Sequence, residues 1–310
     1  MWGNPLAEMV YESMRYFAGA ATPTTRFSSG GGTQGVGEET TMELEQETWK
    51  DPYASADDGG GGFLACSRPF QTLISDINPS YDGDLPGSPF TGAITSTNNN
   101  PTSISSFNAA TEGQTIWNDE FGAGSREVFI GDVANTTDAA PTAKTASSFG
   151  NIRGLSPEEP SKGGTYYTAS VSRFARNTDL NAVTGDQSLS TYAIALASPL
   201  PRIRFPVGDG FISLLPFAKT SSGTFGTGPG PRRPTNTIVD FYVEEIVNLP
   251  GQAFDASVNG GLPYAVFRIN YEDVEQGNDH DMDAIVRYYV VANADGTATV
   301  TLNSEYAAGS

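Results

Sequence analysis

The sequence predicts an α/β domain followed by an antiparallel β-rich domain. A helical stretch at 4–19 and a later one at 166–176 are each followed by an apolar strand, at 70–74 and 190–197. This repeated order of helix and strand is typical of a parallel α/β sheet. After residue 198, short strands alternate with turn signals, which is typical of antiparallel sheets. We therefore place the two domains at 1–198 and 199–310.

The segment 4–19 is the clearest predicted helix. Asn4 suits the N-cap, Pro5 suits the first helical position and Gly19 suits the C-terminal stop. The apolar stripe comprises Leu6, Met9, Val10, Met14 and Phe17, and the charged residues that fall mostly off it are Glu8, Glu12 and Arg15. We expect the stripe to pack on a sheet.

The run 70–74 is short and β-prone, and it reads as a central strand that ends near Asp76. Asn78-Pro79 then forces a turn, and Asp82 and Asp84 follow. Ligands of open α/β sheets bind beyond the carboxyl ends of the strands, which makes Asp76 a candidate ligand-binding residue. The same spacing also fits a strand that is followed by a solvated acidic turn.

Two stretches of the first domain are rich in Ser, Thr, Asn, Gly and Pro. We interpret 83–115 and 131–161 as long polar loop insertions, with one strand at 126–130 between them.

The second domain contains five or six predicted strands, which favours a sandwich or a half-barrel. The runs 203–205 and 211–215 flank Gly208-Asp209-Gly210, a hairpin signal. The other strand-like runs are 237–247, 264–271, 284–292 and 297–302.

A second acidic cluster precedes the strand at 284. Asp279, Asp281 and Asp283 alternate, so in an extended chain all of them point to the same face. Because like charges repel, such a face either lies in bulk solvent or holds a cation, for which Ca²⁺ is the hard-oxygen candidate. A solvated acidic turn remains the alternative.

The charge balance limits the classes of partner. The 310 residues include 17 Lys and Arg against 36 Asp and Glu, a formal net charge of −19. This argues against nucleic-acid binding, which needs basic patches, and favours cations or a basic partner surface. No run approaches the roughly 20 apolar residues of a membrane span. The chain opens directly into a helix with no leader, so we expect a fragment whose N-terminal part is missing.

Few residues suit catalysis. His280 is the only histidine and Cys66 the only cysteine. We expect Cys66 to be a packed thiol, and a Cys–His dyad would require the two domains to converge. Asp76 with Asp82 or Asp84 is the only plausible carboxylate group for a secreted hydrolase. We therefore expect a protein that is not an enzyme.

Several long stretches carry a family resemblance. WGNPLAEMVYESMRYFAG, CSRPFQTLISDINPSYDGDLPG, RGLSPEEPSKGGTYYTASVSRFARNTDL and TYAIALASPLPRIRF resemble the type IV pilus tip-associated adhesin and biogenesis factors, the PilY/PilC family. VDFYVEEIVN, DASVNGGLPYAVFRINYEDVEQGNDHDMDAIVRY and SEYAAGS are also similar. The resemblance spans nearly the whole chain apart from polar loops near Gly30 and at 91–145.

This resemblance implies that the first domain is an incomplete von Willebrand factor A-like (Rossmann-like) domain. The metal-ion-dependent adhesion site of that family uses an Asp-x-Ser-x-Ser strand end, a threonine before a helix and an aspartate after a later strand. Asp76 matches that aspartate, and Asn4 occupies the place of the threonine. The Asp-x-Ser-x-Ser element would precede residue 1, so the resemblance implies only weak binding of Ca²⁺ or Mg²⁺ by this chain. The C-terminal propeller of the family is also absent.

The resemblance further implies a non-enzymatic pilus tip adhesin and assembly factor on the cell surface, at the pilus tip or the outer membrane. The implied partners are minor pilins or other pilus tip components, and a host or abiotic surface. A purely structural scaffold that binds minor pilins is the alternative, and a secreted hydrolase is a third class.

Overall fold

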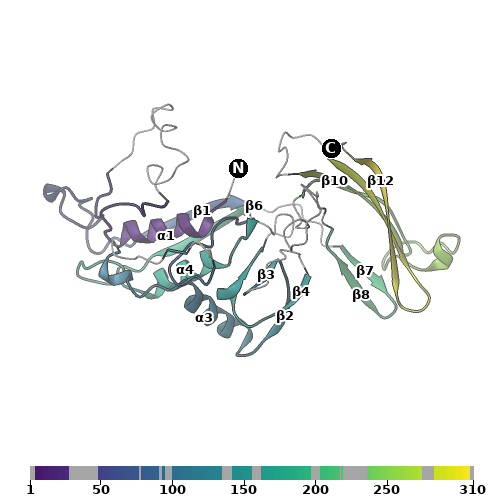
Figure 1. Cartoon of the computed structure of the whole chain (residues 1–310), viewed down its shortest axis with the longest axis horizontal. Helices are drawn as coiled ribbons and strands as arrows, with labels where there is room; N and C mark the ends of the chain where they lie inside the picture. The colour runs from purple at the N-terminus through teal and green to yellow at the C-terminus, as the bar shows by residue number, and fades with distance from the viewer. Residues whose placement is uncertain are drawn as a thin grey trace, which may run out of the picture. The chain divides into compact units, whose positions relative to one another are not determined.

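The chain forms two compact units in a computed structural model: residues 1–156 with 162–197, and residues 157–161 with 198–310 (Figure 1). The structure describes residues 4–27, 48–76, 78–90, 93–94, 100–134, 142–155, 162–196, 203–216, 218, 236–273 and 283–307.

The first unit is built on a two-stranded parallel sheet. Strand β1 (Phe70–Asp76) pairs with β6 (Ser190–Leu196) in parallel register, with Phe70 opposite Ser190 and Asp76 opposite Leu196. A parallel pair requires a long crossover. Here the crossover contains the helices α3 (Ala109–Phe121) and α4 (Tyr167–Asn177). The predicted parallel arrangement of these strands is therefore confirmed.

Helices α1 (Leu6–Phe17) and α4 form the main core of this unit with the loops after β1, and they run beside β1 and β6 in Figure 1. The core residues contributed by the two helices are Ala7, Val10, Tyr11, Met14, Tyr167, Val171, Phe174 and Ala175. Leu73 of β1 packs against this core. Because side chains alternate along a strand, the odd-numbered positions of β1 face the helices.

Five large apolar residues at even-numbered positions of the sheet form an open apolar face. Phe70 and Ile74 of β1 are 57% and 65% exposed. Tyr192, Ile194 and Leu196 of β6 are 58%, 52% and 59% exposed. The register places all of these side chains on the side away from the core. Parallel sheets are normally covered on both faces, so this face is unusual.

Helix α1 buries most of the predicted stripe, since Leu6, Val10 and Met14 are buried and Phe17 packs against the core, but the buried face is wider than predicted. Its N-cap is Pro5, with no side-chain cap, so the expected capping by Asn4 is wrong. Met9 is 55% exposed, whereas Glu8 and Arg15 are 4% and 1% exposed. The buried face follows Ala7, Val10, Tyr11 and Met14 at spacings of three and four residues.

The prediction of long polar loops at 83–115 and 131–161 is wrong in its main point. Apolar residues spaced widely through the first stretch are buried in the main core: Leu85, Phe90, Ile104, Phe107 and Ala109. The second stretch contains β4 (Thr142–Ala146), which pairs with β2 (Arg126–Ile130), and β5 (Ile152–Arg153), which pairs with β3 (Asp132–Val133). These strands pack with α3 around the fully buried Trp117.

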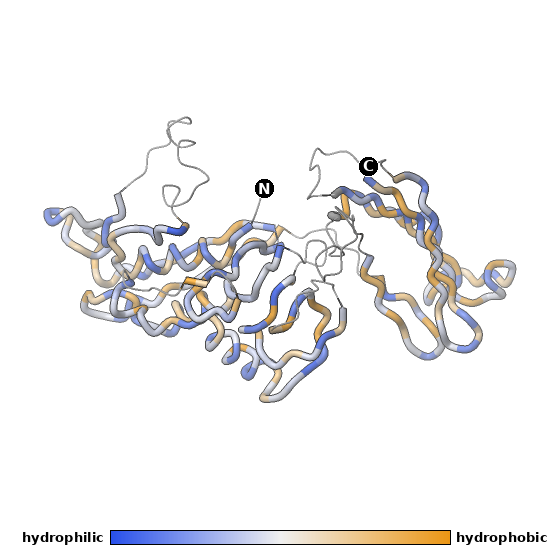
Figure 2. The backbone as a smooth tube through the Cα atoms, viewed as in Figure 1, coloured by the Kyte–Doolittle hydropathy of each residue, from blue (hydrophilic) through white to orange (hydrophobic). Residues whose placement is uncertain are grey.

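The second unit is antiparallel, as predicted. Strands β7 (Ile203–Val207) and β8 (Gly210–Leu214) form a hairpin. The other four strands are β9 (Asn236–Val247), β10 (Tyr264–Asp273), β11 (Ala284–Ala292) and β12 (Ala298–Ala307). They form one sheet in the order β12-β11-β10-β9. Apolar residues, orange in Figure 2, lie along these strands. The hairpin packs on the sheet through Phe205 and Val207, which join Phe267 and Val290 in one core.

None of the helices within the described ranges is both long enough and apolar enough to cross a membrane.

We predict that Gly113→Ala destabilises the first unit by about 1–3 kcal/mol, because this glycine lets α3 approach the segment at 149–151 closely. A Cβ at Gly113 would lie 2.6 Å from the backbone nitrogen of Gly150. Urea denaturation followed by tryptophan fluorescence measures the change. Glu120→Ala, an exposed change on the same helix, should stay within about 0.5 kcal/mol of the wild type. Equal stability of the two variants would contradict the prediction.

Candidate functional site

The carboxyl end of β1 brings two of the predicted site residues together. The Nδ2 of Asn4 donates to Oδ1 of Asp76 at 2.8 Å and to Oγ of Ser75 at 2.9 Å. The backbone N–H of Asn78 donates to the same Asp76 oxygen at 2.9 Å. The main chain of Asn4 is also held, because its N–H donates to Oγ of Ser80 and its carbonyl accepts from the N–H of Ser80. The start of α1 is thereby fixed to the end of β1.

The oxygens at this position do not, by themselves, fit a divalent cation. Asp76 supplies the only carboxylate, and the amide nitrogen of Asn4, a donor, faces it. Ca²⁺ takes six to eight oxygen ligands. Across the described ranges, no group of three or more His, Cys, Asp or Glu side chains has an arrangement suited to a metal ion. A cation at Asp76 would therefore need ligands from outside this set.

A second group of carboxyls lies just beyond Asp76 and is buried. Asp82 is 0% exposed, and its Oδ1 accepts from the backbone N–H of Thr165 at 2.7 Å. The Oγ1 of Thr165 donates to the carbonyl of Asp82 at 3.2 Å. Glu8 of α1 is 4% exposed, and its Oε1 accepts from the backbone N–H of Asp84 at 3.1 Å. These bonds connect α1, the loop after β1 and the start of α4.

Burial changes the protonation of this group. The loss of hydration, together with the nearby charge of Asp82, raises the pKa of Glu8 to about 8. Burial raises the pKa of Asp82 to about 7, against the opposing effect of its bonds from Thr165. Oε2 of Glu8 and Oδ2 of Asp82 are buried and have no hydrogen-bond partner among the described residues. A proton on either carboxyl would turn an acceptor into a donor and lower the cost of burial.

Asp84 completes the acidic group nearer the surface. Its Oδ2 forms an ion pair with Nη2 of Arg26 at 2.6 Å. Burial raises the pKa of Asp84, while the Arg26 guanidinium lowers it. Arg26 is 54% exposed, so solvent screens this pair.

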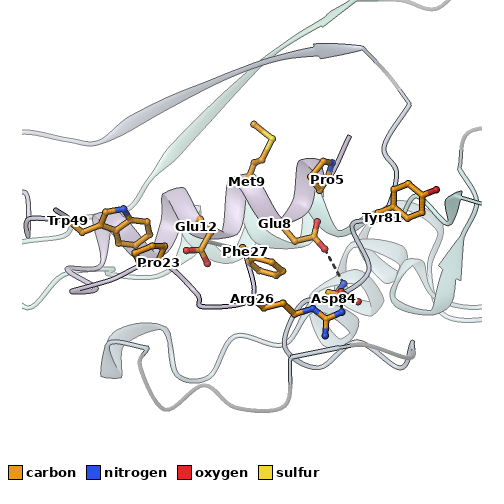
Figure 3. A pocket seen from close by; sticks show the side chains of 10 residues that line it. All are labelled: Pro5, Glu8, Met9, Glu12, Pro23, Arg26, Phe27, Trp49, Tyr81 and Asp84. Carbon is orange, nitrogen blue, oxygen red and sulfur yellow. Dashed lines mark hydrogen bonds and ion pairs between the residues drawn. The ribbon is translucent and has the colours of Figure 1, made fainter. Parts of the chain in front are cut away.

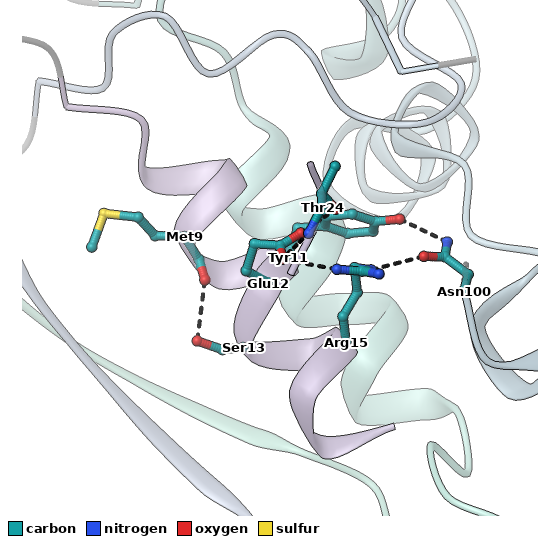
Figure 4. A network of polar contacts seen from close by, with 7 residues as sticks. All are labelled: Met9, Tyr11, Glu12, Ser13, Arg15, Thr24 and Asn100. Carbon is teal, nitrogen blue, oxygen red and sulfur yellow. Dashed lines mark hydrogen bonds and ion pairs between the residues drawn. The ribbon is translucent and has the colours of Figure 1, made fainter. Parts of the chain in front are cut away.

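A buried arginine organises the opposite end of α1 (Figure 4). Nη1 of Arg15 donates to Oε2 of Glu12 at 2.9 Å, and Nε donates to Oδ1 of Asn100 at 2.9 Å. Nδ2 of Asn100 in turn donates to the hydroxyl of Tyr11 at 2.7 Å. Glu12 also accepts from the N–H and the hydroxyl of Thr24. This network holds Glu12 in place and leaves Glu8 as the α1 carboxyl with a free oxygen.

The structure does not test the other acidic cluster that the sequence predicts. Asp279, Asp281 and His280 lie outside the described residues. Asp283 is half-buried, and its backbone N–H donates to the carbonyl of Tyr271 at 2.9 Å. Cys66 is exposed, so the expectation of a packed thiol is wrong.

Sequence reasoning missed Glu8, although a signal for it was present. The positions Ala7, Val10, Tyr11 and Met14 follow a strict spacing of three and four residues, and Val10 and Met14 also belong to the predicted stripe. Alanine is small and tyrosine carries a polar tip, so neither marks a buried face strongly in a count of large apolar residues. On the correct face, Glu8 lies beside buried neighbours, and a buried glutamate indicates a functional or pH-sensitive group.

Comparison with known proteins identifies the family. A family described as "PilY1 homolog, second domain" matches residues 1–175, and one described as "PilY1 homolog, beta-sandwich" matches residues 205–310. This chain belongs to the PilY1-homologue family. The second-domain match contains the whole candidate site, and the beta-sandwich match contains the four-stranded sheet and the hairpin β7–β8 from residue 205 onward.

A curated relative agrees with this assignment and confirms the resemblance noted in the sequence. The "Type IV pilus biogenesis factor PilY1 homolog" of Xylella fastidiosa (strain Temecula1 / ATCC 700964) is 49% identical over 313 residues. The match covers 100% of this chain and 21% of the relative, so the chain spans about a fifth of that protein. No solved structure matches this chain.

We predict that the stability of the protein falls as the pH rises from about 5 to about 8. In the folded state the pKa of Glu8 is about 8 and the pKa of Asp82 is about 7, well above the ordinary values of 4.5 and 3.8 for these carboxyls. The folded state therefore binds more protons than the unfolded state in this window. Each group lowers the free energy of unfolding by up to about 1.4 kcal/mol per pH unit until its folded pKa is passed.

Urea denaturation across this pH window tests the prediction. Glu8→Gln should be more stable than the wild type near pH 8 and should show a shallower pH slope, because the amide needs no proton. Glu127→Gln, which changes an exposed carboxylate on β2, should keep the wild-type slope. An unchanged slope in Glu8→Gln would show that this carboxyl is not the titrating group.

Proposed function

We propose that this chain is a non-enzymatic interaction module of a type IV pilus biogenesis factor. Its membership of the PilY1-homologue family and its 49% identity to a relative named as such a factor support the assignment. The open apolar face of the β1–β6 sheet supports a role in binding, because large exposed apolar patches mark interaction sites.

The occupant we propose for this face is further structure of the same protein. Parallel sheets are stable when helices cover both faces and when more than two strands are paired. Here α1 and α4 serve one face, and Phe70, Ile74 and the three large apolar residues of β6 are exposed on the other. Added strands and helices would complete a von Willebrand factor A-like sheet. The relative, of which this chain spans 21%, has ample sequence to supply them.

The module would then act through its surfaces in pilus assembly and in adhesion. We propose minor pilins or other pilus tip components as partners, and a host or abiotic surface as the adhesion target, with the protein at the cell surface. The net charge of −19 favours a basic partner surface. The alternative is a purely structural scaffold for pilus assembly. Such a scaffold would bind minor pilins but would not bind host or abiotic surfaces.

Hydrolysis by Asp76 with Asp82 or Asp84 is the less favoured function. A hydrolase needs an acid and a base that both reach a substrate. Asp82 is 0% exposed and bonded to Thr165, Asp84 is paired with Arg26, and Asp76 is bonded to Asn4. Each carboxyl thus has its own structural partner, which supports a role in holding the fold.

We predict that lysine substitutions on the open face separate folding from association. The double variant Ile74→Lys, Ile194→Lys should fold as an isolated chain, since both side chains are exposed, and should bind less of a dye that reports exposed apolar surface. In the complete protein the same changes should reduce the number of assembled pili, because the proposed association would bury two unpaired lysines, which is costly. Matched control changes are Thr299→Lys and Thr301→Lys on exposed positions of β12. Wild-type piliation in the double variant would contradict the proposal.

We also propose that a divalent cation assists this function at 279–283. Ca²⁺ should raise the thermal unfolding midpoint of the wild type, because a ligand bound only by the folded state stabilises it. Asp281→Ala should reduce that rise. Asp76→Asn should leave it unchanged in this chain, because the described ligands at Asp76 are too few. If Ca²⁺ leaves the thermal unfolding midpoint of the wild type unchanged, the proposed cation site at 279–283 is refuted.

A further inference from the structure

A groove runs along the outer side of α1, between the helix and the segments at 23–27 and 81–84 (Figure 3). Its volume is about 480 Å³, within the range of ~300–1,000 Å³ that is usual for sites of small ligands. Pro5, Met9 and Phe27 provide apolar walls, and Glu8 and Asp84 provide carboxyls. A long apolar wall beside acidic groups suits a ligand with an aliphatic stem and a cationic end.

Glu8 is the feature that points to a ligand. The residue is 4% exposed and lines the groove, and Oε2 has no hydrogen-bond partner in the described part of the chain. A buried carboxyl oxygen without a donor is unfavourable, so a donor that entered the groove would be stabilised there. Arg26 also lines the groove, and its ion pair with Asp84 is screened by solvent. An incoming cation therefore competes with a weak pair.

The arrangement favours an ammonium over a guanidinium. Arginine binds a carboxylate best through two parallel bonds to both oxygens. Here Oε1 of Glu8 already accepts from the N–H of Asp84 at 3.1 Å, which leaves a single oxygen. A lysine ammonium is a compact point charge that needs only one such acceptor. Its four-carbon stem would lie along Met9 and Phe27.

We propose that this groove binds the side chain of a lysine residue from a protein partner, with the ammonium at Glu8 and Asp84. A protein source is favoured over a free amine by two features. The net charge of −19 attracts basic protein surfaces. The rim presents Met9 and Tyr81, which are 55% and 44% exposed, and residues of these types are enriched in protein interfaces.

Binding of the ammonium is coupled to loss of a proton. The groups that face Glu8 are Asp82 and Asp84 from the loop after β1, Glu12 one turn along α1, and Arg26 across the groove. Burial and the charge of Asp82 raise the pKa of Glu8 to about 8. The lysine binds the ionised form, so affinity should rise by about tenfold per pH unit below that pKa. One proton should be released on binding near neutral pH.

Calorimetric titration of the purified chain with Nα-acetyl-lysine-N-methylamide, at millimolar concentration near pH 8, tests the proposal. The norleucine analogue, which has the stem without the charge, should bind at least tenfold more weakly, and the arginine analogue should also be weaker. Repeating the titration in buffers of different ionisation enthalpy measures the proton release. Equal binding of the lysine and norleucine analogues would overturn the proposal. Tighter binding of 1,5-diaminopentane than of the lysine analogue would overturn the protein source.

Two variants should change the affinity for the lysine analogue in opposite directions, and each has a matched control. Glu8→Gln should weaken binding of the lysine analogue at least tenfold and abolish the proton release, whereas Glu127→Gln should change neither. Arg26→Ala should strengthen binding about two- to fivefold by removing the competing cation. Arg173→Ala, whose ion pairs are with Glu112 and Asp119, makes the same charge change elsewhere and should have no effect. Wild-type binding by Glu8→Gln, or weaker binding by Arg26→Ala, would refute the site. This test uses the ligand alone and is independent of the role in pili.

Discussion

A parallel sheet needs cover on both faces, and the first unit provides it on one. The pairing of β1 with β6 brings together segments more than a hundred residues apart, and the helices α1 and α4 pack on the core side. The other side carries five exposed large apolar residues, at positions 70 and 74 of β1 and at 192, 194 and 196 of β6. The association that we propose would cover this exposed apolar face.

The same constraint explains how the candidate site is built. The chain just before α1 is bonded to the end of β1, because Asn4 forms hydrogen bonds with Asp76 and Ser80. The loop that follows β1 then folds back over α1 and places Asp82 and Asp84 beside Glu8. The acidic groove is therefore a consequence of the helix–strand junction, and its protonation is coupled to the packing of that junction.

The sequence was most informative where periodicity and turn chemistry act locally. The strands of the second unit and the hairpin at Gly208 were predicted because short apolar runs and glycine turns mark them directly. The polar stretches of the first unit were misread because widely spaced apolar residues such as Leu85, Ile104 and Phe149 become part of a core only through tertiary contacts. The meeting of Asn4 and Asp76 was implied by the family resemblance. The burial of Glu8 was not predicted, because the buried face of α1 extends over Ala7 and Tyr11, and alanine and tyrosine mark a buried face only weakly.

Hydrogen–deuterium exchange of β1 and β6 tests the central claim most directly, by comparing this chain alone with the same residues inside the complete protein. If further structure covers the open face, the backbone amides of 72–75 and 192–195 should exchange at least about tenfold more slowly in the complete protein. Amides at the centre of β10, around Ile269, are buried already and should exchange at the same rate in both. Equal exchange of the β1 and β6 amides in the two proteins would contradict the account.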